Sequence, residues 1–109
     1  MRIISQNGTF DVPYEMSTIR NDDGLIILCM AGETGEGSVI ARYSTSEKAE
    51  KAMEMLREQY SRLQVVKILA SSTCEHIEKS LSKDEFLECK LKYREMNIFQ
   101  FPQDEDVEV

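Results

Sequence analysis

The side chains best suited to chemistry in this chain are those of Cys74, His76 and Cys89. Thiolate and imidazole serve as nucleophile and base in cysteine-dependent enzymes, and both are common zinc ligands. His76 comes two positions after Cys74, and side chains at this spacing point in different directions on a helix. A structural zinc site needs four ligands, usually in close pairs, and the sequence has no such spacing. We therefore predict no catalytic residue, no metal site and no cofactor. An enzyme that uses these thiols with His76 is the least favoured alternative.

A glycine-rich stretch, Gly32–Ser38 with the sequence GETGEGS, invites comparison with a phosphate-binding loop. Such a loop ends in Lys followed by Ser or Thr and opens a helix. Here the chain continues through Val39 and Ile40, which favour a strand. Glu33 and Glu36 would also repel a phosphate group. The stretch is therefore interpreted as a polar connection between two strands.

Carboxylates are the more informative charged groups. The formal net charge is −7 and the isoelectric point is about 4.7, which argues against binding to a phosphate backbone. Carboxylates in loops and termini can instead take the place of phosphates in a basic groove of another protein. The residues predicted to bind a partner in this way are Glu33, Glu36, Asp104, Glu105 and Asp106. The alternative is that these acids only keep the protein soluble.

A long amphipathic helix is predicted from about Thr45 to Leu63. Ser44 and Glu47 have the spacing of a capping box, in which each side chain satisfies a backbone N–H of the other residue. Apolar residues then recur at steps of three and four and form one stripe. A stripe of this kind must pack on another element, and a sheet is expected. Its members are Ala49, Ala52, Met53, Leu56, Tyr60 and Leu63.

The first forty-three residues alternate between strand patterns and turns. Asn7-Gly8 is typical of a two-residue hairpin turn, and Pro13 predicts a strand end or an edge strand. The run Leu25–Met30 is apolar throughout, which indicates burial on both faces and hence a central strand. The predicted strands are Arg2–Gln6, Thr9–Val12, Met16–Arg20, Leu25–Met30 and Val39–Tyr43.

The second half is harder to interpret. Val65–Leu69 is predicted as a strand, followed by a short helix up to about Phe86. From Leu87 to Tyr93 apolar and charged residues alternate, which favours a strand, although a helix that continues to Tyr93 stays open as an alternative. Ile98–Phe101 is expected to be the closing strand, stopped by Pro102.

Bulk properties indicate one soluble domain. A chain of 109 residues with 41% hydrophobic and 30% charged residues has the composition of a folded globular domain. Its longest apolar run is much shorter than the roughly 18 residues that span a membrane. The first residues become polar too early for a secretory signal, and three widely spaced cysteines suit a reducing compartment. These features predict a cytoplasmic protein.

Three stretches show a resemblance in sequence: SQNGTFDVPYE, ARYSTSEKAEKAMEMLREQY and IFQFPQDE. They resemble small, mostly uncharacterised proteins from phages and mobile elements of Gram-positive gut bacteria. The resemblance covers about half of the chain, and its motifs are a turn, a cap and a helix stripe. It implies a phage or mobile-element context, in which some small acidic proteins are anti-CRISPR inhibitors of RNA-guided nucleases. It implies no catalytic residue.

We therefore predict an α+β fold: a mostly antiparallel, meander-like sheet of about six to eight strands, one long helix across a face and a second short helix. Residues 1–102 are expected to form a single domain and residues 103–109 an acidic C-terminal tail that is free in solvent. The predicted function is non-enzymatic, namely stoichiometric inhibition or modulation of a host nucleic-acid-handling protein with a basic surface, such as an RNA-guided nuclease. The main alternative is an accessory or structural phage protein that acts by self-association. No direct binding to nucleic acid or membrane is expected.

Overall fold

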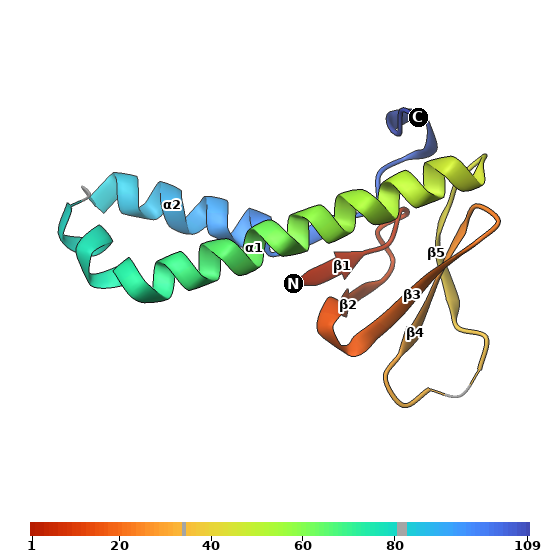
Figure 1. Ribbon diagram of the computed structural model, residues 1–109, viewed down its shortest axis with the longest axis horizontal. Helices are drawn as coiled ribbons and strands as arrows, with labels where there is room; N and C mark the ends of the chain where they lie inside the picture. Colours follow the sequence, from red (N-terminus) through yellow and green to blue (C-terminus); the bar gives the residue numbers. More distant parts are fainter. Residues whose placement is uncertain (34, 81–82) are drawn as a thin grey trace.

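A computed structural model describes residues 1–33, 35–80 and 83–109, and among these the side chains of all but 69–80 and 86. The α+β class, the mostly antiparallel pairing and the long amphipathic helix are confirmed. The strands form two separate sheets of three strands each, rather than the single sheet that was predicted. The long helix α1 (Ser46–Ser80) runs beside both sheets and continues past them, as Figure 1 shows.

The first sheet joins the two ends of the chain. Its order is β2-β1-β6, with β1 (Arg2–Ile4) antiparallel to β2 (Asp11–Pro13) and parallel to β6 (Ile98–Gln100). The predicted hairpin exists, and Pro13 ends an edge strand as expected. The connection is longer than a two-residue turn, and within it only Gly8 has a positive φ, of 77°. The Asn7 side chain instead caps the loop, because its Oδ1 accepts hydrogen bonds from Thr9 and Ser5.

The second sheet is an antiparallel meander in the order β3-β4-β5. Its strands are β3 (Ser17–Asp22), β4 (Leu25–Met30) and β5 (Ser38–Arg42). The predicted central strand is confirmed with the same bounds. Ile26, Ile27 and Leu28 are buried in succession, so both faces of β4 are covered.

The helix α1 (Ser46–Ser80) begins where the sequence predicted, but its cap differs. Thr45 Oγ1 accepts the backbone N–H of Lys48 at 3.2 Å, which is the N-cap bond to the third helical residue. Ser44, predicted as the capping residue, has its hydroxyl turned to Asp104. The expected apolar stripe is confirmed. Ala49, Ala52, Leu56 and Leu63 are buried, and Met53 and Tyr60 pack against the same core.

The predicted strand Val65–Leu69 is wrong, because α1 continues through it to Ser80. No Gly or Pro interrupts the chain between Leu63 and Ser80, and Leu63 extends the buried stripe with 0% exposure. Val65 and Ile68 are exposed on the same helix. Their β-branched side chains favour strands, but the cost of placing them in a helix is only a few tenths of a kcal/mol each.

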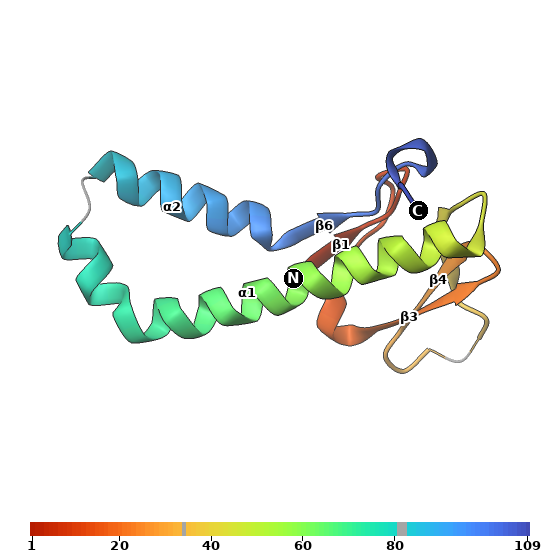
Figure 2. The same cartoon turned by 45° about the horizontal axis from the view of Figure 1, so that its top comes forward.

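The predicted strand Leu87–Tyr93 is also wrong, since these residues belong to α2 (Lys83–Met96), as the open alternative proposed. Tyr93 and Met96, three positions apart, pack against the core, while Leu87 and Leu91 are exposed. Figures 1 and 2 show α1 and α2 side by side as a hairpin that projects from the sheets. Among the described residues, no helix is both long and apolar enough to cross a membrane.

The C-terminal segment is part of the fold and not the free tail that was predicted. After β6, Phe101 is 1% exposed and Val107 is 4% exposed, and both belong to the core. Between them lies a short 3-10 helix, η2 (Asp104–Asp106). An apolar side chain buried this deeply holds the segment in place, which leaves the acids of η2 as a surface of fixed shape.

Candidate partner-binding surface

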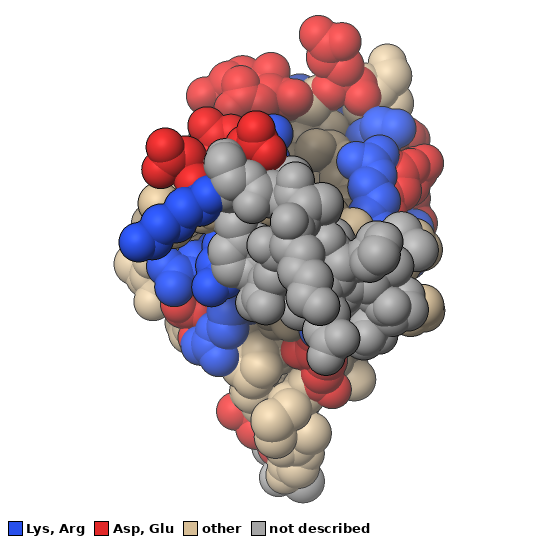
Figure 3. Space-filling model, turned by 90° about the vertical axis from the view of Figure 1, so that its left-hand side faces the viewer, with Lys and Arg blue, Asp and Glu red and all other residues tan. Residues whose placement is uncertain are grey.

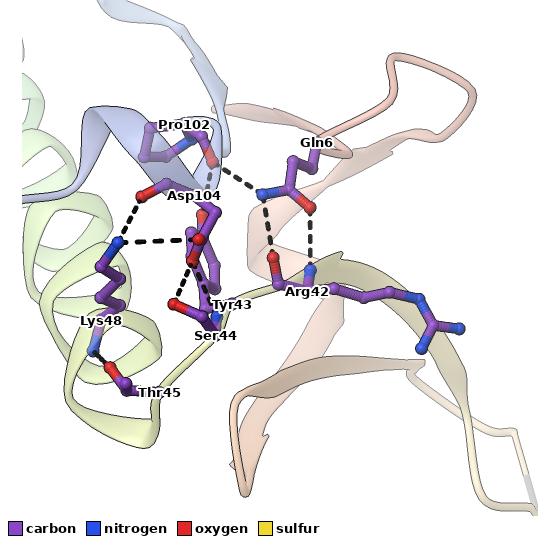
Figure 4. A network of polar contacts seen from close by, with 8 residues as sticks. All are labelled: Gln6, Arg42, Tyr43, Ser44, Thr45, Lys48, Pro102 and Asp104. Atoms are coloured by element: carbon purple, nitrogen blue, oxygen red, sulfur yellow. Dashed lines mark hydrogen bonds and ion pairs between the residues drawn. The ribbon is translucent and has the colours of Figure 1, made fainter.

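Asp104 holds the C-terminal segment against the start of α1 (Figure 4). Its carboxylate accepts the backbone N–H of Ser44 at 2.7 Å and the Ser44 hydroxyl at 3.1 Å. Lys48 Nζ lies 3.6 Å from the same carboxylate and donates to the Asp104 carbonyl at 3.0 Å. The Ser44 N–H bond is the main reason that the Asp104 pKa lies below its ordinary value. Partial desolvation opposes this shift, and the Ser44 hydroxyl and Lys48 assist it. A carboxylate beside a helix N-terminus is also favoured by the helix dipole.

Gln6 and Tyr43 complete this junction between the two sheets. The Gln6 side chain accepts the Arg42 N–H at 2.8 Å and donates to the carbonyls of Arg42 and Pro102, both at 3.1 Å. The Tyr43 hydroxyl donates to the Pro102 carbonyl at 2.7 Å. Burial, with a smaller contribution from Asp104, raises the pKa of Tyr43 well above 10. The junction is thus a network of neutral and charged hydrogen bonds that fixes the C-terminal segment.

The turn between β3 and β4 lies at the same end of the molecule. Asn21 Nδ2 donates to Ser46 O and Oγ, both at 3.2 Å, which places the turn against the first turn of α1. Figures 1 and 2 show this turn and the C-terminal segment on either side of the start of α1. Asp22 and Asp23 in the turn are exposed. We call the acids of these two segments the acidic end; they are Asp22, Asp23, Asp104, Glu105 and Asp106.

Charge is divided unequally between the sheets and the helices. Residues 46–96, which form the helical hairpin, contain ten acidic and ten basic residues. The rest of the chain contains ten acidic and only three basic residues, so it accounts for the whole net charge of −7. Figure 3, which views the molecule from the hairpin end, shows both acidic and basic side chains at the surface. The acidic character therefore belongs to the sheets, their connections and the C-terminal segment, and not to the two helices.

The five acids predicted to bind a partner lie in two places. Asp104, Glu105 and Asp106 belong to the acidic end, whereas Glu33 and Glu36 occupy the β4–β5 connection at the opposite end of β5. The five residues of β5 separate the two groups by about 17 Å, at about 3.3 Å per residue. Glu33 Oε2 accepts the Met30 N–H at 3.0 Å, and the Glu36 carbonyl accepts from Arg20 at 2.9 Å. The structure does not bring the two groups together.

The candidate chemical residues are only partly described. The side chains of Cys74 and His76 lie outside the described residues, so their geometry is not part of the structure. Cys29 and Cys89 are free thiols, with Cys29 partly buried and Cys89 exposed. Where side chains are described, no three His, Cys, Asp or Glu residues are grouped so that they could hold a metal ion.

One hollow was not predicted from the sequence. It lies between α1 and the segment that enters β3, with a volume of about 360 Å³. Glu15 on its wall is engaged by the N-terminal ammonium group at 2.6 Å, a bond that lowers the Glu15 pKa. The other lining residues are Tyr14, Ser17, Ile19, Met53, Leu56 and Arg57. The Glu15 carboxylate is already paired with the N-terminal ammonium group. The other groups on the wall are the Arg57 guanidinium, two hydroxyl-bearing side chains and three apolar side chains.

Comparisons of the chain with protein-family models, with curated proteins and with solved structures found no match.

Proposed function

We propose that the protein is a non-enzymatic inhibitor or modulator of phage or mobile-element origin, which acts in the cytoplasm. Its target would be a host protein that handles nucleic acid, such as an RNA-guided nuclease, bound in a stoichiometric complex. The observation that supports this best is the division of charge, with the whole net charge of −7 outside the helical hairpin. A partner that binds phosphates presents a basic groove, and clustered carboxylates complement such a groove.

The hydrogen bonds of Asp104 support the acidic end as the docking surface. Glu105 and Asp106 are exposed, yet they are flanked by Asp104, which is bonded to Ser44, and by the buried Val107. Their backbone is therefore held in one conformation before a partner arrives. A preformed binding segment loses less conformational entropy on association than a flexible tail does.

Glu33 and Glu36 provide a second contact in this proposal, separate from the first. Because they lie at the other end of β5, one groove would have to extend along that strand to reach both groups. Reversing each pair of charges separately therefore tests how far the partner extends. The first variant is Glu105→Lys/Asp106→Lys and the second is Glu33→Lys/Glu36→Lys. A matched control, Glu54→Lys/Glu88→Lys, makes the same change in net charge on exposed positions of the helices.

The experiment uses the wild-type protein and the three variants as baits in lysate of a host bacterium, at low and high salt. The same proteins are then titrated into DNA cleavage by a guide-loaded nuclease. We expect a nucleic-acid-handling protein to bind the wild type and the control, and to be lost with Glu105→Lys/Asp106→Lys. Association should weaken as salt rises, because exposed charges act over about 8–10 Å at physiological ionic strength.

Two outcomes would contradict the proposal. One is capture and inhibition that survive both the reversal at the acidic end and high salt. The other is equal loss in the control, which would mean that total charge matters and not its position. Folding of each variant is checked by circular dichroism, since none of the substituted side chains is buried.

A further inference from the structure

Strand β3 lies at an edge of the second sheet, and the backbone groups on its outer side have no partner strand. The Met16 carbonyl accepts the Ala31 N–H at 2.7 Å, so the backbone groups of Met16 point towards the neighbouring strand. Backbone groups alternate in direction along a strand. Those of Arg20 therefore also face β4, whereas those of Ile19 and Asn21 face outwards. None of the described residues forms a hydrogen bond with these outward N–H and C=O groups.

The other edge strands are each partly closed by a specific residue. In β5, the Ile40 carbonyl accepts the Gln6 N–H at 2.8 Å. In β6, the Ile98 carbonyl accepts a hydrogen bond from Gln59 Nε2 at 2.8 Å. In β2, Pro13 has no N–H to offer. With six residues, β3 is also the longest of these strands, so its edge is the best suited to accept another strand.

The hollow of about 360 Å³ lies between this same strand and α1. Ser17 and Ile19 line it from β3, and Met53, Leu56 and Arg57 line it from α1. Side chains two positions apart share one face of a strand, so this face of β3 is turned towards α1. A strand added at the edge of β3 would place every second side chain on the same face, next to the hollow. An apolar side chain at that point would pack against Ile19.

The unpaired charge at the hollow is positive. Glu15 on its wall is already paired with the N-terminal ammonium group at 2.6 Å. Arg57 is exposed, and within the described part of the chain no carboxylate forms an ion pair with it. A guanidinium group binds a carboxylate through two parallel hydrogen bonds. A ligand of this hollow is therefore expected to carry a carboxylate as well as an apolar group.

We infer that the edge of β3 and the adjoining hollow bind an extended acidic peptide segment of a partner protein. The segment would add to the sheet as a further strand, with hydrogen bonds to the N–H and C=O groups of Ile19 and Asn21. One apolar side chain of the segment would enter the hollow, and an Asp or Glu side chain would bind Arg57. The occupant is a peptide, because an extended backbone offers donors and acceptors at the spacing of a strand edge. This inference does not depend on the proposed function, since none of the acids of the acidic end lines the hollow.

The experiment begins with random peptides of about ten residues, the length of a long strand, displayed on phage and selected on the immobilised whole protein. The most enriched peptide is synthesised with both termini blocked, so that only a side chain can supply the carboxylate. This probe peptide is labelled with a fluorophore and titrated with the protein, and binding is followed by fluorescence anisotropy. We expect the enriched peptides to alternate apolar and polar residues and to share one Asp or Glu.

Charge reversal at the hollow tests the contact with the carboxylate. Arg57→Glu should weaken binding of the probe peptide about tenfold, because it removes an attractive pair and introduces a repulsive one. Arg62→Glu makes the same change at another exposed arginine of α1 that does not line the hollow, and it should leave binding unchanged. Circular dichroism should show both variants folded, since both side chains are exposed. Equal binding by wild type and Arg57→Glu, or equal loss in the two variants, would overturn the inference.

Amide hydrogen exchange, measured by NMR on the whole protein, tests the pairing with β3 directly. The N–H groups of Ile19 and Asn21 should exchange quickly in the free protein and slowly when the probe peptide is bound. The Arg20 N–H between them faces β4, so it should exchange slowly in both states and serves as the internal control. A saturating probe peptide that leaves exchange at Ile19 and Asn21 unchanged would overturn the inference. A selection that enriches no peptide would overturn it as well.

Discussion

The carboxylate of Asp104 accepts the backbone N–H of Ser44 at 2.7 Å, across 60 positions of the sequence. This bond, with the contact to Lys48, ties the C-terminal segment to the start of the long helix. We expect Asp104→Ala to lower the thermal midpoint and to speed proteolysis after Phe101, because the segment loses its polar anchor. Glu105→Ala removes a neighbouring exposed acid and should change neither measurement. Equal behaviour of the two variants would show that Val107 alone holds the segment.

Stability should depend on acid pH through Asp104 and Glu15. Hydrogen bonds from Ser44 and from the N-terminal ammonium group lower the pKa of these carboxyls in the folded protein. As the pH falls, these carboxyls therefore bind protons in the unfolded chain before they do so in the folded protein. Their contribution to stability is complete above the ordinary pKa values, 3.8 for Asp and 4.5 for Glu, and is lost as the pH falls further. At about pH 7, Glu15→Gln/Asp104→Asn should have a lower thermal midpoint than wild type. Between about pH 5 and pH 3, the thermal midpoint of this variant should fall less than that of wild type. A parallel decrease in both proteins would contradict the assignment.

The contributions of Leu56 in α1 and Leu87 in α2 to the free energy of unfolding should differ because their burial differs. Leu56 is 2% exposed in the core, whereas Leu87 is 57% exposed on the outer face of α2. Leu56→Ala should reduce the free energy of unfolding by about 2–5 kcal/mol, the range for truncation of a buried leucine. The same substitution at Leu87 should change it by less than about 0.5 kcal/mol. Chemical denaturation of the two variants beside wild type measures both changes.

Local chemistry made the strands of the first half predictable. Asp22-Asp23-Gly24 encodes a turn, and the continuous apolar run after it gave Leu25–Met30 with its observed bounds. Local chemistry failed between 65 and 93. Leu87 and Leu91 have both the even spacing of a strand and the four-residue spacing of a helix, so pattern alone does not separate the two. The packing of Tyr93 and Met96 against the core, which depends on distant residues, favours the helix.

The candidate site was predictable in composition but not in position. Among the acids of the C-terminal segment that the sequence singled out, Glu105 and Asp106 are exposed in the structure. It could not show that Asp104 is bonded to Ser44, because no local pattern links residues 60 positions apart. The neutrality of residues 46–96 could have been counted from the sequence, but it gains meaning only once that stretch is known to be two helices.

The N-cap of α1 is Thr45 rather than the predicted Ser44, and substitutions at the two positions distinguish them. Thr45 Oγ1 accepts the Lys48 N–H, while the Ser44 hydroxyl only supplements the backbone bond to Asp104. Thr45→Ala should therefore reduce the free energy of unfolding by about 1 kcal/mol, as for other lost N-caps. Ser44→Ala should have the smaller effect, since the Ser44 N–H remains bonded. The reverse order in denaturant titrations would restore the capping box of Ser44 and Glu47.

The turn that carries Asp22 and Asp23 depends on close contact at Gly24. Gly24 has a φ of +93°, and a Cβ added there would lie 2.7 Å from the Tyr43 carbonyl oxygen. Gly32 has a similar φ of +87°, but a Cβ there would meet no atom within 4 Å. Both substitutions to Ala force a side chain into the left-handed region, which costs about 1–2 kcal/mol.

Gly24→Ala carries the steric clash in addition and should be the more destabilising of the two, with the difference measured by parallel thermal unfolding. The clash involves backbone, so β5 or the turn must move to relieve it. That movement would also weaken the Gly24 carbonyl bond to the Tyr43 N–H, now 2.9 Å long. Equal destabilisation at both glycines would show that the turn yields freely, and that Asp22 and Asp23 are not held rigidly beside the start of α1.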